Sequence, residues 1–258
     1  MGFYSPKSWL NLFFEKVGYR LVKLDSSKTP IQVDMDPGFL PIYEKSKTHT
    51  MSSMANMYAL YKAVQYIADA KIPGDIVECG VWKGGSMMIA ALTLESMGDV
   101  DRQLWLYDTY TGMAQPTDKD VDPYGRSPQQ RWENAESGGI NTWCMAPLDE
   151  VKSNLYSTAY PMQKMRFVEG KVEETIPDSL PETIALLRLD TDFFDSTQHE
   201  LVHLFPKLSP NGVLIIDDYG WWKGSRDATD QYFEANGVNI LLHRVDSTSR
   251  VAIKARTD

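Results

Sequence analysis

Two apolar runs of strand length, each ending in acidic residues, are the clearest pattern in the chain. They are Leu187-Leu-Arg-Leu-Asp190-Thr-Asp192 and Val213-Leu-Ile-Ile-Asp217-Asp218. Continuous apolar runs predict strands that are buried on both faces, and therefore a parallel sheet covered by helices. Because ligands bind beyond the carboxyl ends of such strands, the acids are expected to lie together at one edge. Carboxylates at close range need a compensating cation, which predicts a divalent metal site beside an organic cofactor.

Helical and strand patterns alternate over the rest of the chain, as in an α/β fold. The expected helices cover residues 51–68, 87–97, 147–157, 200–208 and 227–235, and the other expected strands cover residues 75–79, 103–108, 165–168, 239–243 and 250–254. Ser52 or Ser53 is the candidate N-cap of the first helix. Pro210-Asn211-Gly212 is predicted as a turn, and the last two strands as an antiparallel hairpin.

A glycine loop, Gly80-Val-Trp-Lys-Gly84-Gly85-Ser86, joins the strand 75–79 to the next helix. Such a loop lets a ligand approach the backbone and the N-terminus of the helix. It has neither the spacing of the dinucleotide-binding fingerprint nor the Gly-Lys-Ser/Thr of a Walker loop, which argues against an NAD-dependent dehydrogenase. Glu78 and Asp108 end the strands on either side of it, and an acid on the second strand is where Rossmann-like sites hold ribose hydroxyls.

Residues 1–50 are predicted to form a separate part, used for docking or oligomerisation, ahead of the domain at residues 51–258. Apolar residues recur at helical spacing from Trp9 to Val17, and residues 25–50 are rich in Asp, Ser, Pro and Lys. We interpret the first stretch as a helix docked on the domain or on a second subunit, with a membrane-surface helix as the alternative. The second stretch is predicted to be extended.

Residues 109–147 have no long hydrophobic period and are predicted to be an insertion near the site, acting as a lid or binding loop. Its aromatic residues suit contact with a sugar or an aromatic substrate, although packing of the insertion itself is an equal alternative; they are Tyr110, Tyr124, Trp132 and Trp143.

Composition narrows the class of protein further. The chain has 258 residues and a net charge of -9, which argues against nucleic acid as a partner. Its two cysteines, Cys79 and Cys144, cannot form a disulfide framework and indicate a reducing compartment. The start lacks the pattern of a signal peptide, and no apolar run is long enough for a membrane span. A cytoplasmic protein is therefore expected.

Four motifs occur in a fixed order: Glu78-Cys-Gly-Val-Trp-Lys-Gly-Gly-Ser86, Leu104-Trp-Leu-Tyr-Asp108, Arg188-Leu-Asp190-Thr-Asp192 and Ile216-Asp217-Asp218-Tyr219. Together they resemble the macrocin (TylF-type) O-methyltransferase family, whose members use S-adenosylmethionine and Mg²⁺ to methylate sugar hydroxyls of antibiotics. The resemblance implies a Rossmann-like class I methyltransferase. Such a fold has a central, mostly parallel seven-stranded sheet, helices on both faces and a C-terminal antiparallel hairpin.

The resemblance also implies roles for individual residues. Asp190, Asp217 and Asp218 would ligate Mg²⁺, and Asp192 would be the general base. The residues expected around the cofactor are Met51, Glu78, Gly80, Val81, Trp82, Ser86, Asp108, Thr109, Gly170, Val172 and Asp190. Tyr110, Tyr219, Trp221 and Trp222 are candidates for the wall of the acceptor site, with packing of their loops as the alternative.

The chemistry of a sugar hydroxyl agrees with these roles. Such a hydroxyl is a very weak acid, so methylation needs a base for the proton and a metal that stabilises the developing alkoxide. Related catechol-type enzymes carry a lysine three residues after the first metal acid. Phe193 stands there in this chain and favours a sugar over a phenol. For Asp192 a role in orienting its neighbours is the competing interpretation, and a histidine would then be the next candidate base.

The leading prediction is therefore a metal-dependent O-methyltransferase that acts on a hydroxyl of a sugar or glycosylated natural product. A catechol or phenolic O-methyltransferase is the first alternative, and a non-catalytic cofactor-binding subunit is the second. The apolar N-terminal helix and the oligomers common in the resembled family imply a homo-oligomer, a dimer or higher.

Overall fold

The computed structural model describes residues 34–138 and 140–256 of the chain. The helix expected from Trp9 to Val17 lies outside the described residues. The chain divides into two compact units at Pro37, and the second unit, Gly38–Asp258, contains every element described below. No helix in the described part of the chain is both long enough and apolar enough to cross a membrane.

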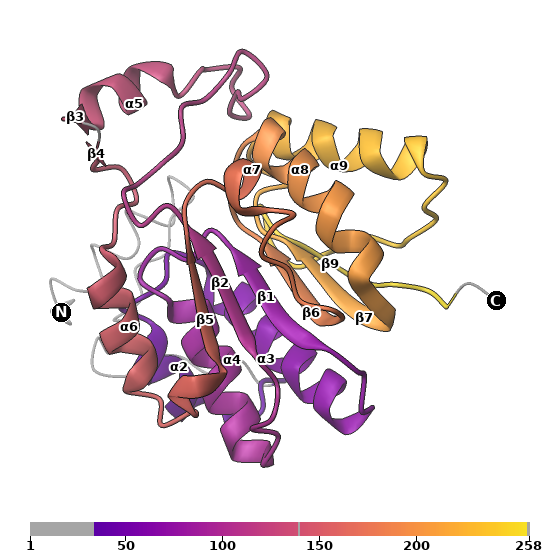
Figure 1. The fold of residues 1–258 in the computed structure, drawn as a ribbon. Helices are drawn as coiled ribbons and strands as arrows, with labels where there is room; N and C mark the ends of the chain where they lie inside the picture. Colours follow the sequence, from indigo (N-terminus) through magenta and orange to yellow (C-terminus); the bar gives the residue numbers. More distant parts are fainter. Residues whose placement is uncertain (1–33, 139, 257–258) are drawn as a thin grey trace, which may run out of the picture. The chain divides into compact units, whose positions relative to one another are not determined.

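The second unit is built around a seven-stranded sheet in the order β5-β2-β1-β6-β7-β9-β8 (Figure 1). The strands are β1 (Asp75–Cys79), β2 (Leu104–Asp108), β5 (Met165–Glu169), β6 (Ile184–Leu189), β7 (Leu208–Ile216), β8 (His243–Arg244) and β9 (Arg250–Ile253). β5, β2, β1, β6 and β7 are mutually parallel, whereas β9 is antiparallel to both β7 and β8. The mostly parallel sheet and the C-terminal hairpin are thus confirmed.

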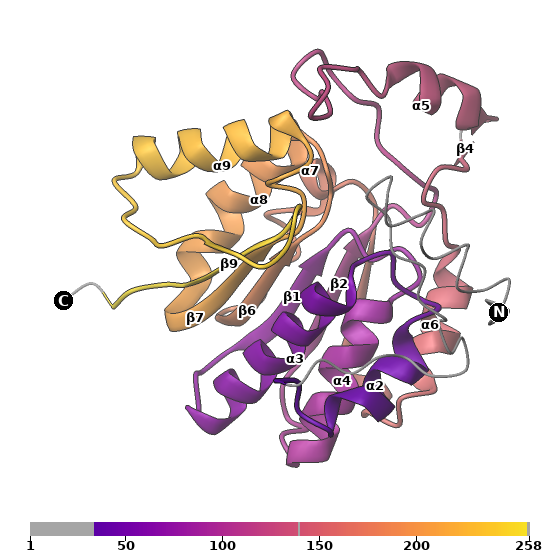
Figure 2. The same ribbon diagram turned by 180° about the vertical axis from the view of Figure 1, so that it is seen from behind.

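Helices cover both faces of this sheet (Figures 1 and 2). On one face lie α2 (Phe39–Ser46), α3 (Met54–Asp69), α4 (Gly85–Met97) and α6 (Leu148–Tyr156), and on the other lie α7 (Val172–Thr175), α8 (Phe194–Leu204) and α9 (Lys223–Ala235). Two short 3-10 turns, Met162–Lys164 and Phe205–Lys207, precede β5 and β7. Ser53 caps α3, because its side chain accepts a hydrogen bond from the Asn56 backbone N–H at 3.1 Å.

Burial explains why β1 and β6 form the centre of the sheet. All six residues of β6 and the last four of β1 are buried, as expected for parallel strands covered on both faces. Arg188 is the charged residue of β6, and only 1% of it is exposed. Its guanidinium is therefore committed to partners inside the protein.

Three expectations about local structure were wrong. The strand expected at residues 239–243 is reduced to β8, His243–Arg244, and residues 239–242 are not in a strand. Residues 39–46 form α2 where extended chain was expected, because Phe39 is buried among the rings of Tyr43, Tyr58 and Tyr61. The segment 210–212, expected to be a turn ahead of the strand, lies within β7. Between the pairs Ile184–Leu208 and Leu186–Val213, β7 has more residues than β6, and the extra residues form a bulge. The bulge is fixed because the Asn211 backbone N–H donates to the Lys254 carbonyl at 2.7 Å.

The predicted insertion contains a helix, α5 (Gln129–Ala135), and a short hairpin of β3 (Glu136–Ser137) and β4 (Ile140–Asn141). Figure 1 shows these elements beyond the carboxyl edge of the parallel strands. Gly112 has φ +98° and packs so closely on the Asn141 carbonyl that a Cβ would lie 1.6 Å from its oxygen. Asp120, fully buried, accepts a hydrogen bond from the Phe194 backbone N–H at 2.8 Å. The insertion is therefore held by close packing between its own two ends and by a hydrogen bond to α8.

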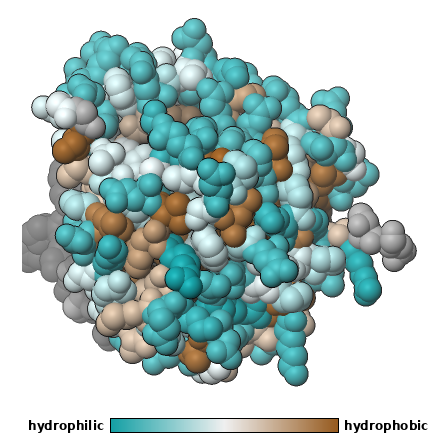
Figure 3. Space-filling view, viewed as in Figure 1, coloured by the Kyte–Doolittle hydropathy of each residue, from teal (hydrophilic) through white to brown (hydrophobic). Residues whose placement is uncertain are grey.

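The outer surface agrees with the acidic composition. Figure 3 shows that hydrophilic residues predominate on the face seen in Figure 1, with apolar residues in small groups among them.

Candidate active site

A cavity of about 550 Å³ opens where β1, β2, β6 and β7 end. Every residue predicted to contact the cofactor lines it except Glu78. Asp192, Asp217, Asp218, Trp221 and Trp222 line it as well. The described parts of its wall therefore bring together residues from strand ends far apart in the sequence, as the alternating pattern predicted.

Tyr110 and Tyr219, two of the four candidates for the acceptor wall, do not line the cavity. Tyr110 is 4% exposed, and its hydroxyl donates to the Leu106 carbonyl at 3.0 Å. The Tyr219 hydroxyl donates to Asp230 at 2.7 Å, and its ring packs against the core. Both side chains pack the loops that carry them, which is the alternative considered for them.

The glycine loop is held close to the end of β6. Gly80 has φ +81°, and a Cβ there would lie 2.1 Å from the Asp190 carbonyl oxygen, so this position requires glycine. Asp108 fixes the loop from β2, because one of its oxygens accepts the backbone N–H groups of Val81 at 2.7 Å and Trp82 at 3.0 Å. The loop thus presents its backbone to the cavity in a fixed shape.

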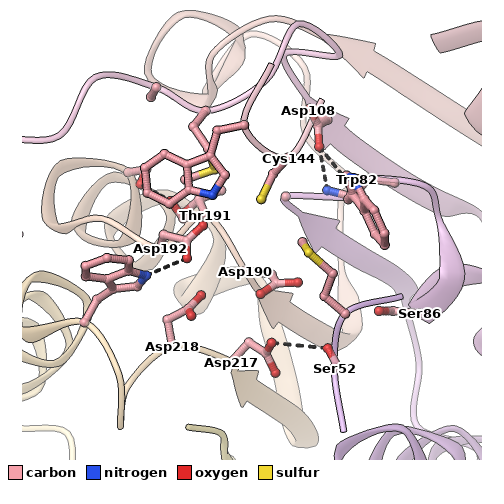
Figure 4. Close-up of a pocket in the computed structure, with 18 of the residues that line it drawn as sticks. Ser52, Trp82, Ser86, Asp108, Cys144, Asp190, Thr191, Asp192, Asp217 and Asp218 are labelled. Carbon is pink, nitrogen blue, oxygen red and sulfur yellow. Dashed lines mark hydrogen bonds between the residues drawn. The ribbon is translucent and has the colours of Figure 1, made fainter. Parts of the chain in front are cut away.

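Backbone hydrogen bonds extend from the strands to the acids at their ends. The Asp190 N–H donates to the Cys79 carbonyl at 2.8 Å, and the Asp217 N–H donates to the Leu189 carbonyl at 2.9 Å. Figure 4 shows the carboxylates of Asp190, Asp192, Asp217 and Asp218 directed into the same part of the cavity. Burial raises the pKa values of Asp190 and Asp218 well above the ordinary value, and repulsion from the neighbouring carboxylates raises them further.

Arg188 is the internal counter-charge of this group. One of its terminal nitrogens lies 2.6 Å from both a Glu78 oxygen and an Asp190 oxygen, and the other lies 3.2 Å from Asp217. Glu78 therefore faces Arg188 behind the cavity wall, although a contact with the cofactor was expected. Burial raises the pKa of Glu78 to about 7, against the opposing effect of the Arg188 charge.

Asp217 is held by four donors. Arg188 and Ser52 approach one of its oxygens, and Asn56 and Ser249 donate to the other. Although burial opposes it, Arg188 and these hydrogen bonds lower the pKa of Asp217. The ionised form of Asp217 is thus favoured, and its contacts tie the start of α3 to the end of β7.

Asp192 has a different environment from the other acids. One of its oxygens accepts a hydrogen bond from the Trp222 indole N–H at 2.7 Å, and its backbone has φ +69°. Burial raises the pKa of Asp192 to about 6. The Trp222 ring packs on Phe193 at 5.6 Å and on Trp143 of the insertion at 6.4 Å, measured between ring centroids. The position of Asp192 is therefore tied to an aromatic cluster.

The sequence predicted no functional role for several residues of the site, although two of them are polar residues at positions where apolar ones are expected. Arg188 is a cation inside an apolar run, and Asn56 is a polar residue on the buried face of α3. Either observation could have indicated a buried charge network. Ser52, Arg131 and Cys144 also line the cavity, and nothing in their spacing marks them.

The donor set can be compared with the magnesium site predicted from the sequence. Within the described residues, no three Asp, Glu, His or Cys side chains are arranged, as they stand, to hold a metal ion. The donors themselves fit Mg²⁺, which prefers oxygen and takes one or two carboxylates together with water. Asp218 also has a buried carboxylate oxygen, Oδ2, without a hydrogen-bond partner, and the raised pKa values indicate a deficit of positive charge.

Residues 32–253 match the macrocin O-methyltransferase (TylF) family. The chain belongs to this family. One relative, the 8-demethyl-8-(2,3-dimethoxy-alpha-L-rhamnosyl)-tetracenomycin-C 4'-O-methyltransferase of Streptomyces olivaceus, is 30% identical over 245 residues, which are 92% of this chain and 90% of the relative. The mycinamicin III 3''-O-methyltransferase of Micromonospora griseorubida is 30% identical over 198 residues, 77% of this chain and 75% of the relative.

The solved structure of the O-methyltransferase NovP superposes with a TM-score of 0.70 and 27% identity, over 81% of this chain and 83% of that one. As a member of the macrocin O-methyltransferase family, the chain is an S-adenosylmethionine-dependent O-methyltransferase with a class I fold. Both expectations from the sequence are confirmed.

Proposed function

We propose that this enzyme methylates a sugar hydroxyl of a glycosylated natural product, with Asp192 as the general base and Mg²⁺ as an essential ion. The observation that carries the proposal is the half-buried carboxylate of Asp192, held by Trp222 beside the acids at the ends of β6 and β7. The two relatives described above, which are named for methylation of a rhamnosylated tetracenomycin and of mycinamicin III, support the substrate class.

The cofactor would lie along the glycine loop and the ends of β1 and β2. Gly80 and Ser86 would surround its methionine part, and Asp108 would bind the ribose hydroxyls, since all three line the cavity. Gly170, which follows β5, and Val172, which begins α7, line the cavity and would contact the adenine. S-adenosylmethionine supplies the methyl group, and the loop holds the donor in a fixed orientation.

Asp190, Asp217 and Asp218 would hold Mg²⁺. The ion, when bound, supplies stabilisation of the negative charge that develops on the acceptor oxygen. Arg188 keeps Asp190 and Asp217 in place from behind, and the four donors around Asp217 prevent its carboxylate from turning away. The oxygen Oδ2 of Asp218 has no competing partner among the described residues.

Asp192 would remove the proton of the acceptor hydroxyl. A base has to reach the hydroxyl at hydrogen-bond distance and be ionised at the working pH. The bond from Trp222 occupies one oxygen of Asp192 and stabilises its charged form. Trp221 and Trp222 would flank the sugar, because both line the cavity beside Asp192.

Methylation of a phenol is the second candidate function, but the lysine that would deprotonate the phenol is missing from the site. Phe193, at the position where catechol-type enzymes carry lysine, is 4% exposed and packs on Trp143 and Trp222. A buried phenyl ring cannot accept a proton, and the loop presents Asp192 in its place.

The test is methyl transfer from S-adenosylmethionine labelled in its methyl group. The acceptors are the tetracenomycin glycoside lacking its 4'-methyl group, mycinamicin III and a panel of catechols. We expect label in a glycoside and none in the catechols. Label in catechols alone would contradict the sugar assignment, and cofactor binding without transfer to any acceptor would favour a non-catalytic subunit.

A further inference from the structure

Glu200 of α8 is a carboxyl group without access to the cavity. It is fully buried, and its Oε2 has no hydrogen-bond partner among the described residues. Its neighbours on the same helix, Leu201 and Leu204, are buried apolar residues. A polar group in such surroundings costs free energy that leucine would not, so packing alone does not explain a glutamate there.

The contact that Glu200 makes leads to the active site. The Thr191 hydroxyl donates to Glu200 Oε1 at 2.9 Å, and Thr191 lies between Asp190 and Asp192 in the chain. This side-chain hydrogen bond joins the turn at the end of β6 to the body of α8, and the Ser196 hydroxyl adds a longer one to the Thr191 carbonyl at 3.4 Å. A shift of Thr191 would therefore move the acid on either side of it.

The turn itself needs such support. Asp192 has φ +69°, a region that L-residues adopt rarely, and the Phe193 N–H donates back to the Thr191 carbonyl at 2.8 Å. A backbone of this kind persists only where its surroundings fix it. The Ser196 hydroxyl, which lies 3.1 Å from the Phe193 carbonyl oxygen and 3.4 Å from that of Thr191, supports the backbone of the turn. Glu200 holds the side chain of Thr191.

We propose that Glu200 is a positioning residue for methyl transfer, which holds Thr191 and thereby orients Asp192 toward the acceptor and Trp222. This inference rests on the role of Asp192 in the proposed function. Burial raises the pKa of Glu200 well above the ordinary value, which favours its neutral form, and its Oε1 accepts the bond from Thr191. Glutamine has the same shape and acceptor, and should therefore replace it.

The test compares Glu200→Leu with Glu200→Gln, and Thr191→Val with Thr191→Ser. Crystal structures give the distance from Asp192 to the Trp222 indole, a readout that needs no acceptor. We expect Glu200→Leu and Thr191→Val to lose this contact and to lower kcat by roughly 10- to 100-fold, because a shift of about 1 Å can cost that much. The affinity for S-adenosylhomocysteine should stay unchanged, and Glu200→Gln and Thr191→Ser should keep both the contact and kcat.

The double variant Glu200→Leu/Thr191→Val separates positioning from a general loss of stability. If the two residues act through one hydrogen bond, the double variant has the kcat of the single variants, whereas independent effects multiply. An intact Asp192–Trp222 contact in Glu200→Leu, or multiplied losses, would overturn the proposal. Should Glu200→Leu fail to fold, Thr191→Val against Thr191→Ser decides the same question.

Failure of this inference is distinguishable from failure of the proposed function. If Asp192→Asn is inactive and Glu200→Leu is as active as the wild type, only the role of Glu200 is refuted. If Asp192→Asn is fully active, the proposed base itself is refuted.

Discussion

Asp192 combines the properties that a base for a sugar hydroxyl requires. Its carboxylate is in the cavity, one of its oxygens is held at 2.7 Å by Trp222, and its pKa is raised to about 6 by burial. A base works best when its pKa lies near the working pH, because it is then both ionised and able to take a proton. The neighbouring Asp217, with its lowered pKa and four donors, is suited to holding charge and not to moving protons.

Replacing Asp192 by asparagine keeps the shape of the side chain and removes the base. General-base catalysis contributes about 10²- to 10⁴-fold, so kcat should fall within that range. Methyl transfer to the glycoside measures kcat, and calorimetry with S-adenosylhomocysteine provides the control. An unchanged affinity for that product would assign the loss to chemistry, whereas a kcat above a tenth of the wild-type value would contradict the role of Asp192.

The pH profile should respond to Trp222. A general base acts in its ionised form, so with Asp192 in the proposed role activity should rise as the pH increases through about 6. Trp222→Phe removes the hydrogen bond that lowers the pKa of Asp192, and the rising limb should therefore move to higher pH. Trp221→Phe is the matched control, because the Trp221 indole makes no hydrogen bond to Asp192 and the limb should stay in place whatever happens to KM. A shift of the limb in both variants, or in neither, would argue against the contact.

At the scale of elements, the insertion is held to the rest of the enzyme by a few contacts. The aromatic cluster of Trp143, Phe193 and Trp222 covers Asp192, and Asp120 joins the loop to the start of α8. The second oxygen of Asp120 accepts both the backbone N–H and the hydroxyl of Thr117. These contacts link the acceptor side of the cavity to α8 and α9.

Removal of the Asp120 carboxylate should loosen the insertion. Asp120→Ala leaves the buried Phe194 N–H without its partner, which costs about 1–3 kcal/mol and lowers the midpoint of thermal unfolding. Limited proteolysis should cut within residues 109–147 sooner than in the wild type. Asp118→Ala, at an exposed position of the same loop, should change neither property. Equal behaviour of the two variants would show that Asp120 does not anchor the insertion.

The order and type of the elements around the site were predictable from the sequence because buried parallel strands and amphipathic helices have distinct periods. The acids at the ends of β6 and β7 followed from this order. The contacts of Asp217 with four donors could not be predicted from the sequence, since they join segments far apart in the chain; the donors are Ser52, Asn56, Ser249 and Arg188. The helix α2 and the bulge in β7 depend on tertiary packing, which no local pattern encodes.

At the scale of the whole molecule, three groups of residues meet around one cavity. The glycine loop and Asp108 form one wall, the acids around Arg188 form the floor, and the insertion with Trp222 lies beside Asp192. Binding of the donor, the proposed ion and the acceptor in this one cavity would favour group transfer. The homo-oligomer, the cytoplasmic location and the docking role of residues 1–50 stay predictions; light scattering on the purified chain would test the first.

The most direct test of the central claim is a titration of the metal-stripped enzyme with Mg²⁺. Methyl transfer to the glycoside and the heat of Mg²⁺ binding are measured on wild type and on Asp218→Asn. We predict that stripping with EDTA abolishes transfer, that Mg²⁺ restores it with a single binding event in the wild type, and that Asp218→Asn weakens both. Full transfer by stripped enzyme, with no heat of Mg²⁺ binding, would contradict the proposed role of the acids at the ends of β6 and β7.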